Sequence, residues 1–164
     1  MKNALLLFFF IAISGSVSTA QQQVGLHAGQ YSNISYRIFN TDEHATEIML
    51  ADRYNGFHLA YYTENFRPLE NKWSGDVFLY TGFGAHAGFC SAKKDYYEYD
   101  DSDDRFYRWG PLAGAGFMAG VEYRFSSLPL TAGIDYNPFA EISVARIFSM
   151  NLWNFGAHVR YSFK

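Results

Sequence analysis

The chain has 164 residues, with 13 Lys and Arg against 16 Asp and Glu, and a net charge of −3. This length suits one domain, and the slightly negative balance argues against a nucleic-acid-binding surface. Hydrophobic residues make up 49% of the chain and charged residues 18%, which excludes a chain disordered by composition. The single cysteine, Cys90, excludes an internal disulfide and a CxxC metal site.

Residues 1–20 have the layout of a secretory signal peptide. Lys2 gives a short positive region, Ala4–Ser14 is dominated by apolar residues, and Ser18–Ala20 supplies small residues before a cleavage point. The apolar run is too short to anchor the chain across a bilayer, and no cysteine follows that could carry a lipid. We therefore expect residues 1–20 to be removed and residues 21–164 to form the one folded domain.

Downstream of residue 20 the dominant pattern is an alternation with a period of two. In Gly56–Glu64, in Leu112–Phe125 and in Trp153–Phe163, apolar and aromatic residues alternate with small, polar or charged ones. This period is that of β-strands with two different faces. In chain order the pattern predicts eight strands, at about Gln23–Gln30, Asn33–Phe39, Ala45–Tyr54, Gly56–Arg67, Asp76–Ser91, Trp109–Phe125, Leu130–Ala140 and Met150–Phe163.

The two faces of these strands differ in a way that indicates a membrane barrel. One face is continuously apolar, whereas the other carries glycines beside Phe78 and Tyr80 together with most of the strand charges. In a narrow barrel such a mixture fills the interior, so the apolar face points at lipid. A closed barrel also leaves no unpaired strand edge in the membrane. The charges assigned to the interior, as a network of pairs, are Arg37, Glu47, Glu64, Glu122, Arg124, Asp135 and Arg160.

Two other fold classes compete with this prediction. A soluble lipid-binding barrel would place its apolar face inside, and the continuous aromatic face disfavours it. A helical membrane protein would use the uncharged run Val77–Ala92, but this run contains several glycines and is too short for a full span. The sequence therefore predicts an all-β, eight-stranded, antiparallel, up-and-down transmembrane β-barrel.

Several stretches resemble a known family. They are Asn33–Phe39, Asn55–Leu59, Tyr80–Phe89 and Gly120–Pro129 with the following Leu130–Tyr136. They look like the small outer-membrane β-barrels of Gram-negative bacteria, which are similar in architecture to OmpX and the OmpA membrane domain. The resemblance implies both termini in the periplasm, longer loops outside, contact with outer-membrane lipid and lipopolysaccharide, and recognition by the barrel-assembly machinery. That machinery reads a terminal aromatic residue in such barrels; here the alternation ends at Phe163, and Lys164 follows.

The candidate chemistry within the strands favours structure over catalysis. An eight-stranded barrel is filled by side chains, so the interior charges are expected to pair rather than to act on a substrate. His27, His58, His86 and His158 take interior positions, but no ligand spacing supports a metal site, and no cofactor is expected. A hydrolase would need a nucleophile near a base. His158 and Ser162 share a face but lie about 13 Å apart along the strand.

The most distinctive local feature is an acidic stretch with three interleaved tyrosines, predicted to lie in a long outer loop. Its carboxylates are those of Asp95, Glu98, Asp100, Asp101, Asp103 and Asp104. They could bind a divalent cation that bridges to lipopolysaccharide phosphates, and the tyrosines could contact an extracellular partner. The alternative is a solvated acidic loop.

Together these observations predict a monomeric outer-membrane barrel with a filled, charge-paired interior and a structural or surface-interaction role. It is expected not to be an enzyme. The alternatives are a lipid-modifying barrel enzyme and, less favoured by a packed interior, a narrow ion-conducting pore.

Overall fold

A computed structural model describes residues 21–53, 56–69, 75–93, 107–143 and 148–163. The described residues contain no helix that is long and apolar enough to cross a membrane. They form ten strands: β1 (Gln22–Gly29), β2 (Asn33–Phe39), β3 (His44–Arg53), β4 (Gly56–Leu69), β5 (Gly75–Lys93), β6 (Tyr107–Phe125), β7 (Leu130–Tyr136), β8 (Phe139–Ser143), β9 (Ser149–Asn151) and β10 (Phe155–Phe163).

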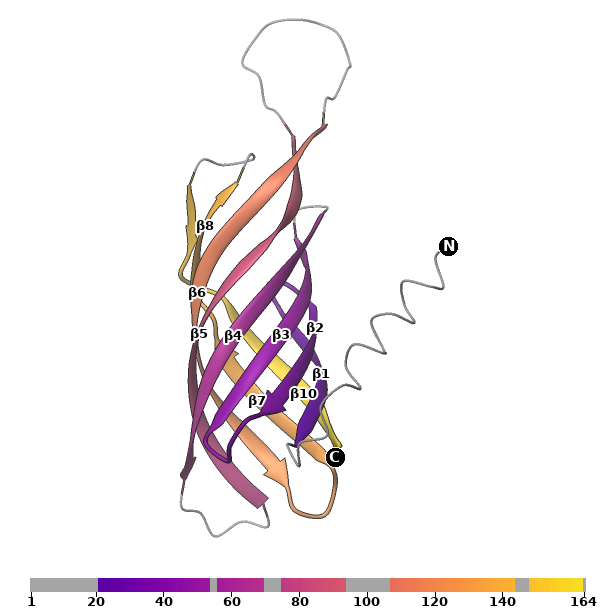
Figure 1. Cartoon of the computed structure of the whole chain (residues 1–164), viewed down its shortest axis with the longest axis vertical. Coiled ribbons are helices and arrows are strands. Elements are labelled where there is room, and N and C mark those ends of the chain that lie inside the picture. The colour runs from indigo at the N-terminus through magenta and orange to yellow at the C-terminus, as the bar shows by residue number, and fades with distance from the viewer. Residues whose placement is uncertain (1–20, 54–55, 70–74, 94–106, 144–147, 164) are drawn as a thin grey trace, which may run out of the picture.

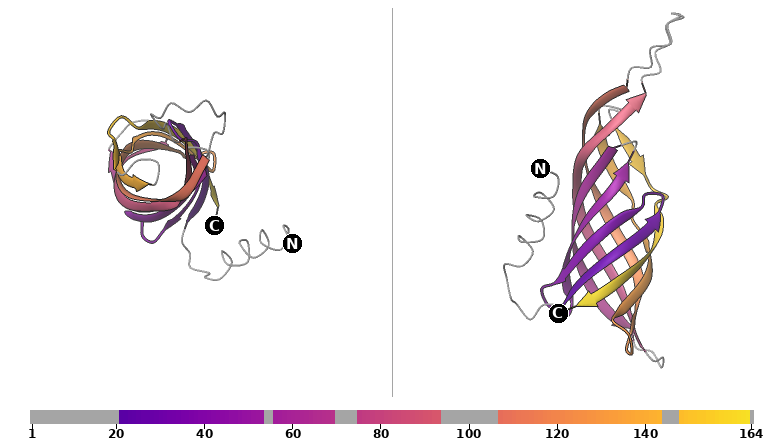
Figure 2. Two further views of the ribbon diagram at one scale, coloured as in Figure 1. Left: turned by 90° about the horizontal axis from the view of Figure 1, so that it is seen from above. Right: turned by 90° about the vertical axis from the view of Figure 1, so that its right-hand side faces the viewer.

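The strands close into one antiparallel barrel (Figures 1 and 2). Strands β1 to β7 pair in sequence, and β10 lies between β7 and β1. The wall has eight strands, because two of them are each made of two segments. Strands β7 and β8 pair one after the other with β6 and so form one strand of the wall. Strand β9 pairs with β8 and is followed by β10, which pairs with β7, so β9 and β10 form another. The predicted fold class and the eight strands are therefore confirmed.

Two predicted strands are interrupted. The expected strand Leu130–Ala140 breaks into β7 and β8 at residues 137–138, and Met150–Phe163 breaks into β9 and β10 at residues 152–154. Pro138 has no N–H to give to the ladder. The two breaks face each other, since Asn137 donates its backbone N–H to the carbonyl of Asn154 at 2.8 Å.

The ends of the barrel are uneven. Strands β5 and β6 have 19 residues each, against 8 in β1. Figure 1 shows β5 and β6 rising beyond the other strands at one end, while β1 begins and β10 ends at the opposite end. The long segment between β5 and β6 therefore starts at the end away from the first and last strands of the barrel.

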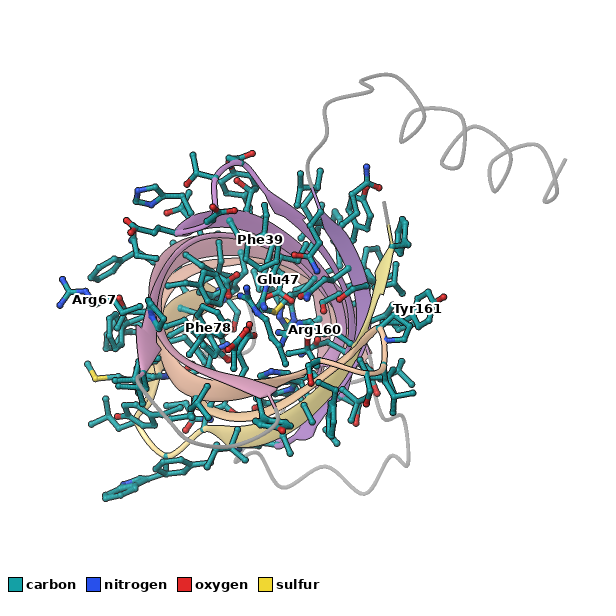
Figure 3. The ribbon with its side chains drawn as sticks, turned by 90° about the horizontal axis from the view of Figure 1, so that it is seen from below. Phe39, Glu47, Arg67, Phe78, Arg160 and Tyr161 are labelled. Carbon is teal, nitrogen blue, oxygen red and sulfur yellow. The ribbon has the colours of Figure 1, made fainter. Side chains whose placement is uncertain are left out.

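The two faces of the wall have the polarity predicted from the sequence. Outward-facing Leu26, Phe83 and Ile134 are 66%, 68% and 65% exposed, respectively. The inward-facing Arg37 and Glu122 are fully buried. Figure 3 looks along the barrel and shows Glu47 and Arg160 inside, with Tyr161 pointing out. The outer surface is thus apolar and the interior polar, the reverse of a soluble barrel.

The turn between β2 and β3 is short and firmly held, as its Asn and Asp content predicts. The backbone N–H of Asn40 donates to the carbonyl of His44 at 2.9 Å, and the N–H of His44 donates to Thr41 Oγ1 at 3.1 Å. The carbonyl of Glu43 accepts the N–H of Phe66 at 2.7 Å, which ties the turn to β4.

Candidate functional site

The centre of the interior is an ion-pair cluster built around Arg37 on β2. Its guanidinium nitrogens lie 2.7 and 2.9 Å from the two carboxylate oxygens of Glu64 on β4. They also lie 2.8 Å from Glu122 on β6 and 3.2 Å from Glu47 on β3. All four side chains are fully buried. One side chain therefore joins four strands across the lumen.

Two further arginines balance the three glutamates. Arg160 on β10 lies 2.9 Å from Glu47 and 3.9 Å from Glu122, and Arg124 on β6 lies 2.7 Å from Glu122. The formal charges of the three arginines and the three glutamates are equal and opposite. This matters because a buried charge is tolerated only when it is paired and hydrogen-bonded.

Aromatic rings pack beneath this cluster, toward the end where the chain enters and leaves the barrel. Arg37 lies 5.1 Å from the centre of the Phe66 ring, and Arg124 lies 3.9 Å from that of Phe78 and 4.6 Å from that of Phe39. Such contacts stabilise cations that have left water. The rings and the ion pairs together fill this half of the lumen.

Asp135 has other partners than the sequence suggested. It was placed with the arginines, but its oxygens lie 2.9 Å from His27 Nε2 and 3.0 Å from His158 Nδ1. The Tyr80 hydroxyl donates to it at 3.3 Å. Asp135 therefore belongs to a second, histidine-containing layer above the arginine cluster. Parity along a strand assigns the face of a residue but not its height in the barrel.

The interior polar residues that the sequence analysis does not assign include Gln23 and Glu141. The amide of Gln23 donates to the Thr131 hydroxyl at 3.3 Å and accepts from Arg37 at 3.4 Å. Glu141 lies 3.5 Å from His86 Nε2, beyond the expected end of its strand at Ala140. Both residues occupy inward-facing positions of the alternating pattern, so that pattern alone is enough to predict that they face the lumen.

Glycines on neighbouring strands make room for the bulky interior side chains. A Cβ at Gly120 would lie 2.6 Å from Cζ of Tyr80, and one at Gly133 would lie 2.6 Å from His158 Nε2. A Cβ at Gly114 would lie 2.5 Å from His86 Nε2. Large and small residues therefore alternate around the lumen, as a filled barrel requires.

Gly120→Ala is expected to destabilise the barrel by about 1–3 kcal/mol, because the added methyl overlaps Tyr80 and the backbone carbonyl of Ile134. Urea unfolding of the refolded protein in lipid vesicles measures the effect. Ala119→Val, on the outer face of the same strand, is the matched control and should change stability little. An equal cost for both substitutions would show that the lumen is not tightly packed here.

The upper half of the lumen encloses a small polar cavity of about 30 Å³. It is lined by His27, His58, His86, Tyr62, Asn137 and Asn154, among others. The Tyr62 hydroxyl donates to Asn137 at 3.1 Å and Asn154 donates to the Asn137 carbonyl at 2.9 Å, which closes the cavity from one side. This volume is on the order of one or two water molecules. Within the described part of the chain, no three His, Cys, Asp or Glu residues are arranged to hold a metal ion.

The acidic stretch lies outside the described residues. This holds for all six of its carboxylates, from Asp95 to Asp104. Its contact with a cation or a partner stays a prediction.

Comparisons with known proteins give matches in structure but none in sequence. No family model matches the chain, and no curated protein matches it in sequence. Among solved structures, the N-terminal β-barrel domain of Pseudomonas aeruginosa OprF is similar with a TM-score of 0.55 and 14% identity, over 88% of this chain and 96% of that one. Neisserial surface protein A, NspA, matches with a TM-score of 0.40 and 12% identity, over 88% of this chain and 94% of that one. The chain therefore shares its fold, a closed eight-stranded antiparallel barrel, with the OprF barrel domain.

Proposed function

We propose that this protein is an integral outer-membrane barrel with a structural or surface-interaction role, whose lumen is a packed plug and not a conduit. The observation that carries the proposal is the bridging of four strands by Arg37, which binds three glutamates in a fully buried cluster. A transported solute would have to break all of these contacts. The aromatic rings below and the small cavity above leave little open space in line with them.

The location in an outer membrane is supported by the outer face and by the fold. The outward side chains are apolar from strand to strand, and strands β1 to β7 pair with β10 into a closed ladder, which is the sheet arrangement that a membrane permits. The likeness to the OprF barrel domain adds to this at the level of the fold. In this proposal the end holding the start of β1 and the end of β10 faces the periplasm, and the long β5–β6 connection faces outward.

The interior chemistry favours a non-catalytic role. Asp135 and His158 form the kind of pair that orients a base in hydrolases. However, the other ring nitrogen of His158 has no hydrogen-bond partner among the described residues and lies 3.9 Å from Glu122 rather than beside a hydroxyl. Both side chains are also only 1% exposed, which disfavours contact with a lipid substrate. We propose that it positions strands and does no chemistry.

The remaining partners in the proposal lie at the surface. Outer-membrane lipid and lipopolysaccharide surround the wall of a monomer, the barrel-assembly machinery inserts it, and the acidic segment between β5 and β6 contacts an extracellular partner or a divalent cation. The position of that segment, between the two longest strands of the barrel, supports its role in surface contact.

The plug is tested by single-channel recording of the purified protein in a planar bilayer. We expect no stable conductance steps, because the arginine cluster blocks the lumen. Reproducible open-channel steps that disappear with heat-denatured protein would contradict a packed lumen and favour the pore.

The non-catalytic role is tested separately by comparing lipid A mass profiles of cells with and without the gene. Identical profiles are expected. A change in the acyl chains of lipid A that is restored by the intact gene would favour the enzyme.

A further inference from the structure

The outer wall carries a groove with polar residues in its lining, at the end of the barrel where β2 turns into β3. The groove measures about 620 Å³. It arises because the β2–β3 turn stops short, while β4 and β5 continue past it. Its outward lining consists of Glu43 from the turn, His44 from the start of β3, Asn65 and Arg67 from β4, and Leu79 and Thr81 from β5.

The outward-facing basic side chains of the described wall, Arg67 and His44, both line this groove. Among arginines whose side chains the structure describes, Arg37, Arg124 and Arg160 point into the lumen, whereas Arg67 points out. Figure 3 shows Arg67 projecting away from the barrel. Of the five histidines, His44 is the exposed one and the other four are buried inside. No ion pair joins Arg67 to another residue that the structure describes.

The groove is preorganised by the backbone. The Glu43 carbonyl accepts the N–H of Phe66 at 2.7 Å, which holds the turn against the residue next to Arg67. His44 lies directly opposite Asn65 in the β3–β4 ladder. The Arg67 guanidinium, the His44 imidazole and the Glu43 carboxylate therefore belong to residues that line one groove together with apolar Leu79. Leu79 on β5 lies opposite Arg67 in the β4–β5 ladder.

The position of the groove along the wall is that of a membrane–water interface. Arg67 lies two residues from the end of β4, and outward Leu69 and Leu79 flank it with apolar surface. Arginine at such a depth keeps its stem in apolar surroundings and its guanidinium among polar headgroups. This placement rests on the membrane location argued under the proposed function.

We propose that the groove binds the headgroup of a phosphoethanolamine lipid from the periplasmic leaflet. Arg67 and His44 bind the phosphodiester, for which the planar guanidinium fork is well suited. The Glu43 carboxylate accepts the ammonium group, and an acyl chain lies along Leu79. This assignment uses both signs of charge in the groove, whereas an anionic lipid without an ammonium group would leave Glu43 facing a like charge.

The proposal is tested by native mass spectrometry of the full folded protein in detergent with equal amounts of phosphatidylethanolamine, phosphatidylglycerol and phosphatidylcholine. The unsubstituted protein should retain phosphatidylethanolamine preferentially. Arg67→Gln should lower the bound fraction about tenfold, the effect of losing a charged hydrogen bond, and Arg67→Lys should give an intermediate value, because it keeps the charge but not the guanidinium fork. Glu43→Gln should remove the preference for phosphatidylethanolamine over phosphatidylglycerol while binding of both persists.

Asp52→Asn is the matched control, because it removes an outward charge at the other end of β3 and should leave lipid binding unchanged. Equal retention of the three lipids by the unsubstituted protein, or undiminished retention by folded Arg67→Gln, would overturn the assignment. Insertion into phosphatidylcholine vesicles is measured in parallel. Failure of the unsubstituted protein to insert there would overturn the proposed membrane location instead.

Discussion

Replacing Arg37 by methionine is expected to lower the free energy of unfolding by about 3–5 kcal/mol. The substitution removes the cation that lies within 3.2 Å of Glu47, Glu64 and Glu122, and it leaves their carboxylates in a lumen without enough positive charge. Equilibrium unfolding in urea, followed by tryptophan fluorescence and by electrophoretic mobility of the folded form, measures the loss.

Two further variants separate the role of charge from that of packing. Glu64→Gln added to Arg37→Met should recover part of the loss, because it removes one of the stranded carboxylates. The outward Arg67→Met, which breaks no ion pair among the described residues, should change stability by less than about 0.5 kcal/mol. The loss of unfolding free energy in the Arg37→Met, Glu64→Gln double variant is compared with the losses in Arg37→Met alone and in Glu64→Gln alone. A double loss equal to the sum of the two single losses would argue against a coupled cluster.

Leu26→Arg is expected to destabilise the protein in a bilayer by about 2–4 kcal/mol if the residue sits near the midplane, because lipid cannot solvate the charge. Leu26 lies midway along β1, is 66% exposed, and pairs with Val159 and Ile34, which also face outward. Unfolding titrations in vesicles of matched thickness give the difference.

The control for Leu26→Arg is Leu26→Ala, which keeps an apolar surface against lipid and should cost far less. If Leu26→Arg were as stable as the unsubstituted protein in vesicles, the outer face of β1 would not lie in hydrocarbon. Such a result would argue against the membrane location as a whole, whereas a loss for Arg37→Met tests only the lumen.

The alternation of residues was enough to determine the fold class and the face of each strand residue. A period of two leaves only two faces, and a narrow barrel has only an inside and an outside. The inward position of Arg37, Glu64 and Glu122 therefore follows from parity alone, and so does that of the missed Glu141. The continuous apolar character of the opposite face then indicates lipid outside.

Only the tertiary structure decided which interior residues meet. Contacts across the lumen depend on the register of every strand pair and on the tilt of the strands, and neither is encoded in local periodicity. For this reason Asp135 was predicted in the same network as the arginines but lies with His27 and His158. The groove at Arg67 was also invisible in the sequence, because it exists only where the short β2–β3 turn ends beside the longer β4 and β5.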